Sequence, residues 1–277
     1  MSDQSELRKY VPALVWYRPF EPYAYAFIRF GTGFVLLMHG AQRLFFGAKT
    51  AELGPLLAGL SPSLIGTVEL IGGAALAIGL LTRPLALLFA LEWLAVALSA
   101  HIPAGKSWFM FGATEHFPAL IVALCVAFVV RGGGWFSLDR SIGKALPAVT
   151  YAYIRILLGL LFLPIGIDKL FMGGAGRIAA GNILRVGVEP PLVWAWFVGC
   201  VEFSAAILLI LGLFTRLAAF ALAIELTTII WFIVSPRGWV WTVNGVEVAL
   251  LVLLVAIGIV FGGSGRYSLD RKIGREF

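Results

Sequence analysis

The sequence S-L-D-R-S-I-G-K at residues 137–144 decides the organisation of the chain, because S-L-D-R-K-I-G-R follows at residues 268–275. Each copy comes after a long apolar run and a glycine-rich hinge. The two copies lie about 131 residues apart in a chain of 277 residues, so they divide it nearly in half. A repeat of this length predicts two related structural units.

Matches between the two halves continue in a constant order outside these motifs. Y-A-F-I-R at residues 25–29 corresponds to Y-A-Y-I-R at 151–155, and G-L-L-T-R at 79–83 corresponds to G-L-F-T-R at 212–216. An ordered series of this kind predicts a tandem duplication. Charged residues also occupy equivalent positions in the two halves: Arg43 corresponds to Lys169, Glu69 to Glu202, Glu92 to Glu225, and Glu115 to Glu247.

The composition is typical of an integral membrane protein. Hydrophobic residues make up 60% of the chain and charged residues 13%, whereas a soluble domain carries about 25% charged residues. Residues 1–20 are polar and of mixed charge, so we expect no cleaved signal peptide. The net charge of +6 is explained by basic loops on one side of a membrane, and we expect no nucleic-acid partner. Cys125 and Cys200 lie in separate apolar runs, which favours packing over dithiol chemistry.

Eight apolar runs are long enough to cross a bilayer as helices, four in each half. We therefore predict an all-α integral membrane protein whose eight transmembrane helices form two tandem four-helix bundles in parallel orientation. A T-R dipeptide joins the second and third helices of each half, which predicts tight hairpins, and the longer first connectors are expected to hold short helices. The predicted helices cover residues 23–43, 64–82, 84–102, 115–131, 149–170, 193–213, 216–234 and 243–262.

Lys and Arg residues are more frequent on the side of the membrane that receives both ends of the chain. This bias predicts a multi-pass protein of the plasma (inner) membrane with both termini in the cytoplasm. Each half has an even number of predicted spans, so a pseudo-two-fold axis along the membrane normal should relate them. We divide the chain into a cytoplasmic N-terminal segment at residues 1–22, a first unit at 23–146 and a second unit at 147–277 that ends in a cytoplasmic tail.

Charged residues within the spans fall into two layers. In the inner layer, Arg29 and Glu92 lie about two turns from the cytoplasmic side of their helices, as do Arg155 and Glu225. The matched depths predict two buried ion pairs, Arg29 with Glu92 and Arg155 with Glu225. Such pairs serve either to fix helix register or to bind a proton or substrate.

The outer layer is richer and differs between the two halves. In the second half it consists of Asp168, Lys169, Glu202 and Glu247, with Ile165 and Val234 where the first half has histidines. We expect the first unit to hold the working site and the second to be a structural partner with its own pairing of Asp168, Lys169 and Glu202. The outer layer of the first half contains His39, Gln42, Arg43, Glu69, His101, Glu115 and His116.

Three interpretations of this outer layer remain open. It is a hydrogen-bonded polar layer at the headgroup boundary, a quinone site in which a histidine donates to a quinone oxygen and a carboxylate relays protons, or a haem or metal site on the three histidines His39, His101 and His116. For the quinone site, the residues assigned to catalysis are His39, Glu69, His101 and Glu115, and those assigned to quinone binding are His39, Arg43, Glu69, His101 and His116.

The pattern resembles the DoxX family, which implies a four-helix membrane module that works beside redox enzymes. Both units show the resemblance, over about residues 25–144 and 151–275, and an ordinary member of the family resembles one unit. The nearest activity it implies is that of the DoxD-type subunit of thiosulfate:quinone oxidoreductase. The residues that carry the resemblance in the first unit are Arg29, His39-Gly40, Arg43-Leu44-Phe45, Glu69, Gly72-Gly73, Thr82-Arg83, His101, Glu115 and 137–140.

The expected function is therefore that of a membrane subunit of a quinone-linked oxidoreductase. The sequence holds no flavin, iron–sulfur or c-type haem motif, so the electron donor is expected on a periplasmic or membrane redox partner or on a small molecule. This function predicts an apolar slot, open to lipid, that ends at His39, Glu69 and His101. The alternatives are a transporter or channel, with a polar path through the layer of Arg29 and Glu92, and a scaffold or assembly factor for a periplasmic redox enzyme. A homo-oligomer is compatible with each.

Overall fold

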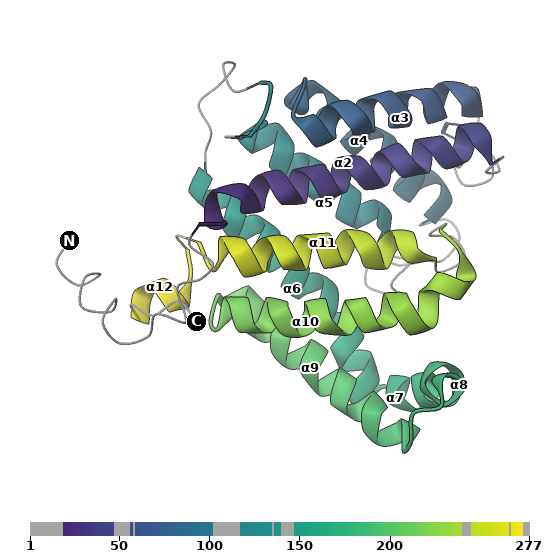
Figure 1. Ribbon diagram of the computed structural model, residues 1–277, viewed down its shortest axis with the longest axis vertical. Helices are drawn as coiled ribbons and strands as arrows, with labels where there is room; N and C mark the ends of the chain where they lie inside the picture. Colours follow the sequence, from purple (N-terminus) through teal and green to yellow (C-terminus); the bar gives the residue numbers. More distant parts are fainter. Residues whose placement is uncertain are drawn as a thin grey trace.

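The computed structural model describes residues 19–46, 56–57, 59–101, 117–134, 136–139, 147–239, 245–265 and 267–273. All regular secondary structure in these ranges is helical, which confirms the predicted all-α class. Each of the eight predicted apolar runs forms a helix (Figure 1). The first unit contains α2 (Glu21–Phe45), α3 (Pro62–Ile78), α4 (Thr82–Val96) and α5 (Phe117–Arg131), and the second contains α6 (Pro147–Phe171), α9 (Pro191–Leu211), α10 (Thr215–Ile229) and α11 (Val246–Gly262).

Shorter helical segments extend or connect these eight. The third helix of each unit continues into a π-helical turn, and the connector after α6 holds the expected short helices. That connector turns by 89° from the direction of the preceding helix. The shorter segments are η3 (Ala97–His101), α7 (Gly174–Ile178), η5 (Ala179–Ile183), α8 (Leu184–Val186), η6 (Ile230–Val234), η7 (Ser235–Arg237) and α12 (Leu269–Ile273).

Fewer than eight helices meet the length and hydropathy of a membrane span. Within the described ranges, Thr82–Ser99, Pro191–Leu211 and Thr215–Arg237 are long and apolar enough, and α6 with the bent connector adds a fourth if the two form one span. Three other apolar helices, α3, α5 and α11, have only 15 to 17 residues, whereas a bilayer core takes about 20. The helices are thus as predicted, but eight membrane crossings are not confirmed.

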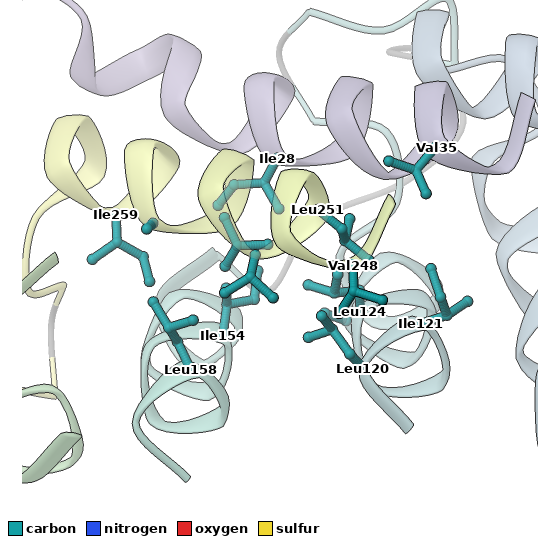
Figure 2. Packing of buried hydrophobic residues seen from close by; sticks show 14 of the residues in the cluster. Ile28, Val35, Leu120, Ile121, Leu124, Ile154, Leu158, Val248, Leu251 and Ile259 are labelled. Atoms are coloured by element: carbon teal, nitrogen blue, oxygen red, sulfur yellow. The ribbon is translucent and has the colours of Figure 1, made fainter. Parts of the chain in front are cut away.

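The two units share one hydrophobic core instead of forming separate bundles. The fourth helix of each unit packs against the first helix of the other, so that α11 lies on α2 and α5 lies on α6 (Figure 1). Side chains from these four helices meet at the centre of the molecule (Figure 2). The labelled core residues are Ile28 and Val35 of α2, Leu120, Ile121 and Leu124 of α5, Ile154 and Leu158 of α6, and Val248, Leu251 and Ile259 of α11.

Glycines bring the backbones of α2 and α3 into direct contact. A Cβ atom added to Gly40 would lie 2.3 Å from the amide nitrogen of Leu70, and one added to Gly73 would lie 2.5 Å from the amide nitrogen of Leu37. Gly33 makes a similarly close approach to the backbone of α3. Small residues permit such approaches between membrane helices. The contact places the C-terminal half of α2 directly beside the middle of α3.

The repeated S-L-D-R motif caps the third helix of its unit. The amide N–H groups of Leu81 and Thr82 donate to Asp139, at 2.9 Å to Oδ1 and 2.5 Å to Oδ2. Leu81 has a φ of 51°, in the left-handed region, so the tight turn into α4 depends on this cap. Burial opposes ionisation of Asp139, but the hydrogen bonds from Thr82 and Leu81 outweigh it and lower the pKa of the carboxyl group.

The second copy of the motif does the same for α10. Asp270 accepts from the amide of Phe214 at 2.7 Å and from that of Thr215 at 3.1 Å. Phe214 has a φ of 47°, which matches the strained residue of the first unit. The motif that recurs most clearly in the sequence is therefore a structural clamp that ties the end of each unit to its central hairpin.

The predicted ion pairs Arg29–Glu92 and Arg155–Glu225 are wrong. Arg29 donates instead to backbone carbonyl groups after α5, those of Gly133 and Phe136, the latter at 2.5 Å. Arg155 likewise donates to the carbonyl groups of Ser264 and Tyr267 after α11. A guanidinium group has five donors, and these contacts use its terminal nitrogens, whereas Nε of both arginines is buried without a hydrogen-bond partner among the described residues. Matching depth along two helices does not fix the direction in which a side chain points.

We expect Asp139→Ala and Asp270→Ala each to reduce the free energy of unfolding by about 1 kcal/mol, because each removes a helix cap. Thermal unfolding in detergent measures the change, and Arg271→Ala, an exposed neighbour, is the matched control. The lowered pKa of Asp139 also predicts how the stabilising effect of this cap changes with pH. Its stabilising effect is present above the ordinary carboxyl pKa and is lost as the pH falls through the lowered value, so the defect of Asp139→Ala should shrink in acid.

Gly40→Ala and Gly73→Ala should each destabilise the fold by about 1–3 kcal/mol, because the added methyl group has no room between the two backbones. Gly176→Ala is the control, since a Cβ atom there meets no other atom within 4 Å. Thermal unfolding in detergent compares the three variants. Equal stability of all three would contradict the close contact between α2 and α3.

Candidate functional site

A buried cluster of charged side chains joins α2 to α3. Nδ1 of His39 lies 3.0 Å from Oε1 of Glu69, and Nε of Arg43 lies 3.0 Å from Oε2 of Glu69. Nε of Arg43 also lies 3.3 Å from Nδ1 of His39. Glu69 is 0% exposed, and the other two residues are also buried. The predicted association of His39, Arg43 and Glu69 is thus present as one compact site.

Local geometry explains why these three side chains meet. His39 and Arg43 are four residues apart on α2, a spacing that places both on one face of a helix. Gly40, between them, lies against the backbone of α3 beside Glu69. The glycine contact therefore brings Glu69 within hydrogen-bond distance of two basic side chains.

Glu92 of α4 extends the cluster to a third helix. Its carboxyl group lies within hydrogen-bond reach of the Glu69 carboxyl group. Two carboxyl groups can hydrogen bond only if they share a proton, because an ionised carboxylate has no donor. Oε1 of Glu92 is buried and accepts no hydrogen bond from the residues that the structure describes. The chain from His39 through Glu69 to Glu92 is therefore suited to hold and pass a proton.

An apolar pocket of about 310 Å³ lies between α3, α4 and the end of the connector that precedes α3. Glu92 is the one acidic residue that lines it, and the other lining residues are aliphatic. The pocket thus places an acidic residue beside an otherwise lipophilic space. Its aliphatic residues are Leu57, Leu60, Leu64, Ile65, Val68, Leu88 and Leu91.

Trp93 packs on the histidine of the cluster. It is 1% exposed, and its ring lies 5.0 Å from that of His39 and 5.0 Å from that of Phe117. No role was predicted for Trp93, and Glu92 was predicted to lie in the inner layer instead of beside Glu69. The sequence contains a sign that Trp93 and His39 belong together, since the second unit has Leu226 in place of Trp93 and Ile165 in place of His39. The two aromatic rings occur together in one unit and are replaced together in the other.

Several predicted site residues fall outside the part of the chain that the structure describes. These are the whole of Glu115 and His116, and the side chain of His101 at the end of η3. The haem or metal interpretation, which needs all three histidines, therefore stays a prediction. Among the described residues, no group of three His, Cys, Asp or Glu side chains could hold a metal ion.

The second unit repeats the carboxyl pair with different partners. Lys169 forms an ion pair with Glu202, and the carboxyl group of Glu225 on α10 faces that of Glu202. Asp168, expected in the same pairing, instead accepts from Arg177 of α7, at 2.7 Å to Oδ2. The second unit therefore keeps the two acids and one base of the first.

The chain is similar to known membrane proteins in both of its halves. A family model described as DoxX matches residues 24–102 and 151–235. An uncharacterized protein of Haemophilus influenzae is 35% identical over 130 residues, which are 44% of this chain and 88% of the relative. An uncharacterized membrane protein of Mycobacterium tuberculosis is 32% identical over 133 residues, 44% of this chain and 80% of the relative. No solved structure matches. Each relative aligns over most of its own length with less than half of this chain.

Arg43→Met should destabilise the protein by about 3–5 kcal/mol, because it leaves the Glu69 charge buried without its cation. Arg43→Lys should restore most of this stability, since Lys169 pairs with the equivalent Glu202 in the second unit. Thermal unfolding in detergent measures both variants. A mild effect of Arg43→Met would mean that Glu69 does not depend on this partner.

Proposed function

This chain belongs to the DoxX family of membrane proteins, and we propose that it is a membrane subunit of a quinone-linked oxidoreductase whose first unit binds the quinone head. The position of Glu92 carries the proposal. This residue lines the apolar pocket and contacts Glu69, which in turn contacts His39 and Arg43. A lipophilic space therefore meets a chain of proton-exchanging groups at one point.

The lining of the pocket fits a quinone head. Ligand pockets have volumes of about 300–1,000 Å³, with mostly apolar walls and a few polar groups that fix orientation. Here the walls are the aliphatic side chains of α3 and α4, and the polar group is the carboxyl of Glu92. A quinone takes up two electrons and two protons when it is reduced to the quinol. Glu92 would donate a proton at the pocket wall, and Glu69 with His39 would replace it from behind.

Burial of the cluster gives each residue a distinct role. Arg43 compensates the charge of Glu69, so that the proton shared by the two acids can leave without creating two unpaired anions. Trp93 holds the imidazole of His39 in place against Glu69. The fully buried position of Glu69 keeps bulk water away from this exchange.

The proposal extends to the arrangement in the membrane. We place all eight long helices across the plasma (inner) membrane, with both termini in the cytoplasm and the cluster of His39, Arg43 and Glu69 toward the outer side. The electron donor would be a periplasmic or membrane redox partner, as in the DoxD-type subunit of thiosulfate:quinone oxidoreductase that the sequence resembles. The basic bias of the terminal side and the outer position of the cluster on α2 support this orientation.

The structure favours the quinone site over the transporter. A solute path was expected to continue from the outer cluster through the layer of Arg29 and Glu92. Glu92 instead turns toward Glu69, and Arg29 is held by the carbonyl groups after α5. Glu92 is therefore part of a proton-exchanging cluster, whereas Arg29 is part of a structural contact.

The test is to purify the full-length protein in mild detergent and to extract and weigh any bound quinone. Val68→Trp should abolish quinone binding, because it fills the pocket without touching the charged cluster. Glu92→Gln should weaken binding about tenfold, the effect of losing one hydrogen bond to the quinone head. Glu225→Gln, the equivalent change in the second unit, is the matched control and should leave binding unchanged.

Two results would contradict the proposal. One is a folded wild-type protein that neither retains quinone nor binds added quinone. The other is equal retention by wild type, Val68→Trp and Glu225→Gln, which would place any bound quinone outside this pocket. A Soret band in the purified protein would instead support haem ligation by the histidines.

A further inference from the structure

Glu225 in the second unit has a carboxyl group without a donor. Both of its oxygen atoms are buried, and neither accepts a hydrogen bond from the described residues. The charged groups that act on it are Glu202 of α9 and Lys169 of α6. A buried carboxylate in this state is costly, because nothing replaces the water that it has lost.

The neighbouring ion pair does not satisfy this carboxyl group. Lys169 donates to Oε1 of Glu202, and the other oxygen, Oε2, is buried without a hydrogen-bond partner among the described residues. Two carboxyl groups therefore face each other with one cation beside them. One proton shared by the acids removes the excess negative charge and supplies the missing donor.

We propose that Glu202 and Glu225 bind one exchangeable proton, which makes the second unit a proton-binding site separate from the quinone pocket. The ligand is the proton itself, held between two carboxyl groups from α9 and α10. This inference goes beyond the proposed quinone function and does not depend on it.

A second polar pair lies next to this site in the sequence. Asp168 precedes Lys169 and accepts from Arg177 of α7. The side chain of Arg177 is 61% exposed, so this pair reaches an accessible surface. In the first unit Gln42 takes the place of Asp168. The pair of Asp168 and Arg177 is therefore a feature of the second unit.

The second site lacks the features that suit the first to a quinone. Ile165 and Leu226 stand where the first unit has His39 and Trp93. The pocket of about 290 Å³ between α9 and α10 is lined by residues other than Glu225. This pair of acids thus has a proton to exchange but neither the histidine nor the adjoining apolar pocket of the first unit.

Dicyclohexylcarbodiimide tests the proposal, because this apolar reagent reacts with protonated carboxyl groups that it can reach from lipid or detergent. The carboxyl proton moves to a nitrogen of the reagent as the carboxyl oxygen bonds to its central carbon. The adduct rearranges to a stable N-acylurea, so the peptide gains the whole mass of the reagent. Glu225 is half-buried as a residue while its two carboxyl oxygens are buried, so an apolar reagent that enters from lipid or detergent is the suitable probe.

Full-length protein in detergent at neutral pH should carry this adduct on the peptide that contains Glu225, as located by mass spectrometry. Glu225→Gln should remove it, whereas Glu189→Gln, a change at an exposed acid in the connector, should leave it unchanged. The wild-type peptide map decides the question even if Glu225→Gln does not fold. The adduct on Glu92 is read on a different peptide, so the two units are judged separately.

Two outcomes would overturn the proposal. An unlabelled Glu202–Glu225 pair would mean that both acids are ionised or that neither exchanges its proton. Suppression of the labelling by sodium ions at constant pH would mean that the pair binds a metal cation instead of a proton.

Discussion

The first unit depends on how the charge of Glu69 is met inside an apolar interior. A fully buried carboxylate is tolerated only beside a cation and hydrogen-bond donors, and α2 supplies both through Arg43 and His39. These contacts with Glu69 are possible only because glycines let the backbones of α2 and α3 touch. A single constraint, close backbone contact, thus sets the helix packing and the chemistry of the site together.

The two duplicated units share their structural contacts but differ in the residues around the site. Both units keep the aspartate that caps the third helix and the arginine that binds carbonyl groups after the fourth helix. The partners of these side chains occupy equivalent positions in the two units. Both also keep the two facing carboxyl groups and a base. The aromatic rings that surround this pair are present only in the first unit. The same structural contacts therefore support both halves, whereas the quinone chemistry that we propose is confined to one.

The eight long helices were predicted correctly, whereas the partners of the charged side chains were predicted only in part. Long apolar runs bounded by glycine, proline and T-R turns gave all eight long helices, because length and hydropathy are local properties. The pairs Arg29–Glu92 and Arg155–Glu225 failed, because depth along a helix says nothing about its rotation. Glu92 turned toward Glu69 because the face of α4 that carries it lies against α3. Spacing on one helix was a better guide, as the pairing of His39 and Arg43 with Glu69 shows.

The sequence by itself determined the membrane class, the duplication, the helices and the residues of the charged cluster, because hydropathy, repetition and charge placement can all be read along the chain. Only the tertiary structure decided that the S-L-D-R motif is a helix cap, that Glu92 joins Glu69 at an apolar pocket, and that α11 and α5 join the two units into one core. These depend on how helices distant in sequence rotate and approach one another. That is fixed by the packing of whole surfaces, such as the glycine contact between α2 and α3, and not by any local pattern.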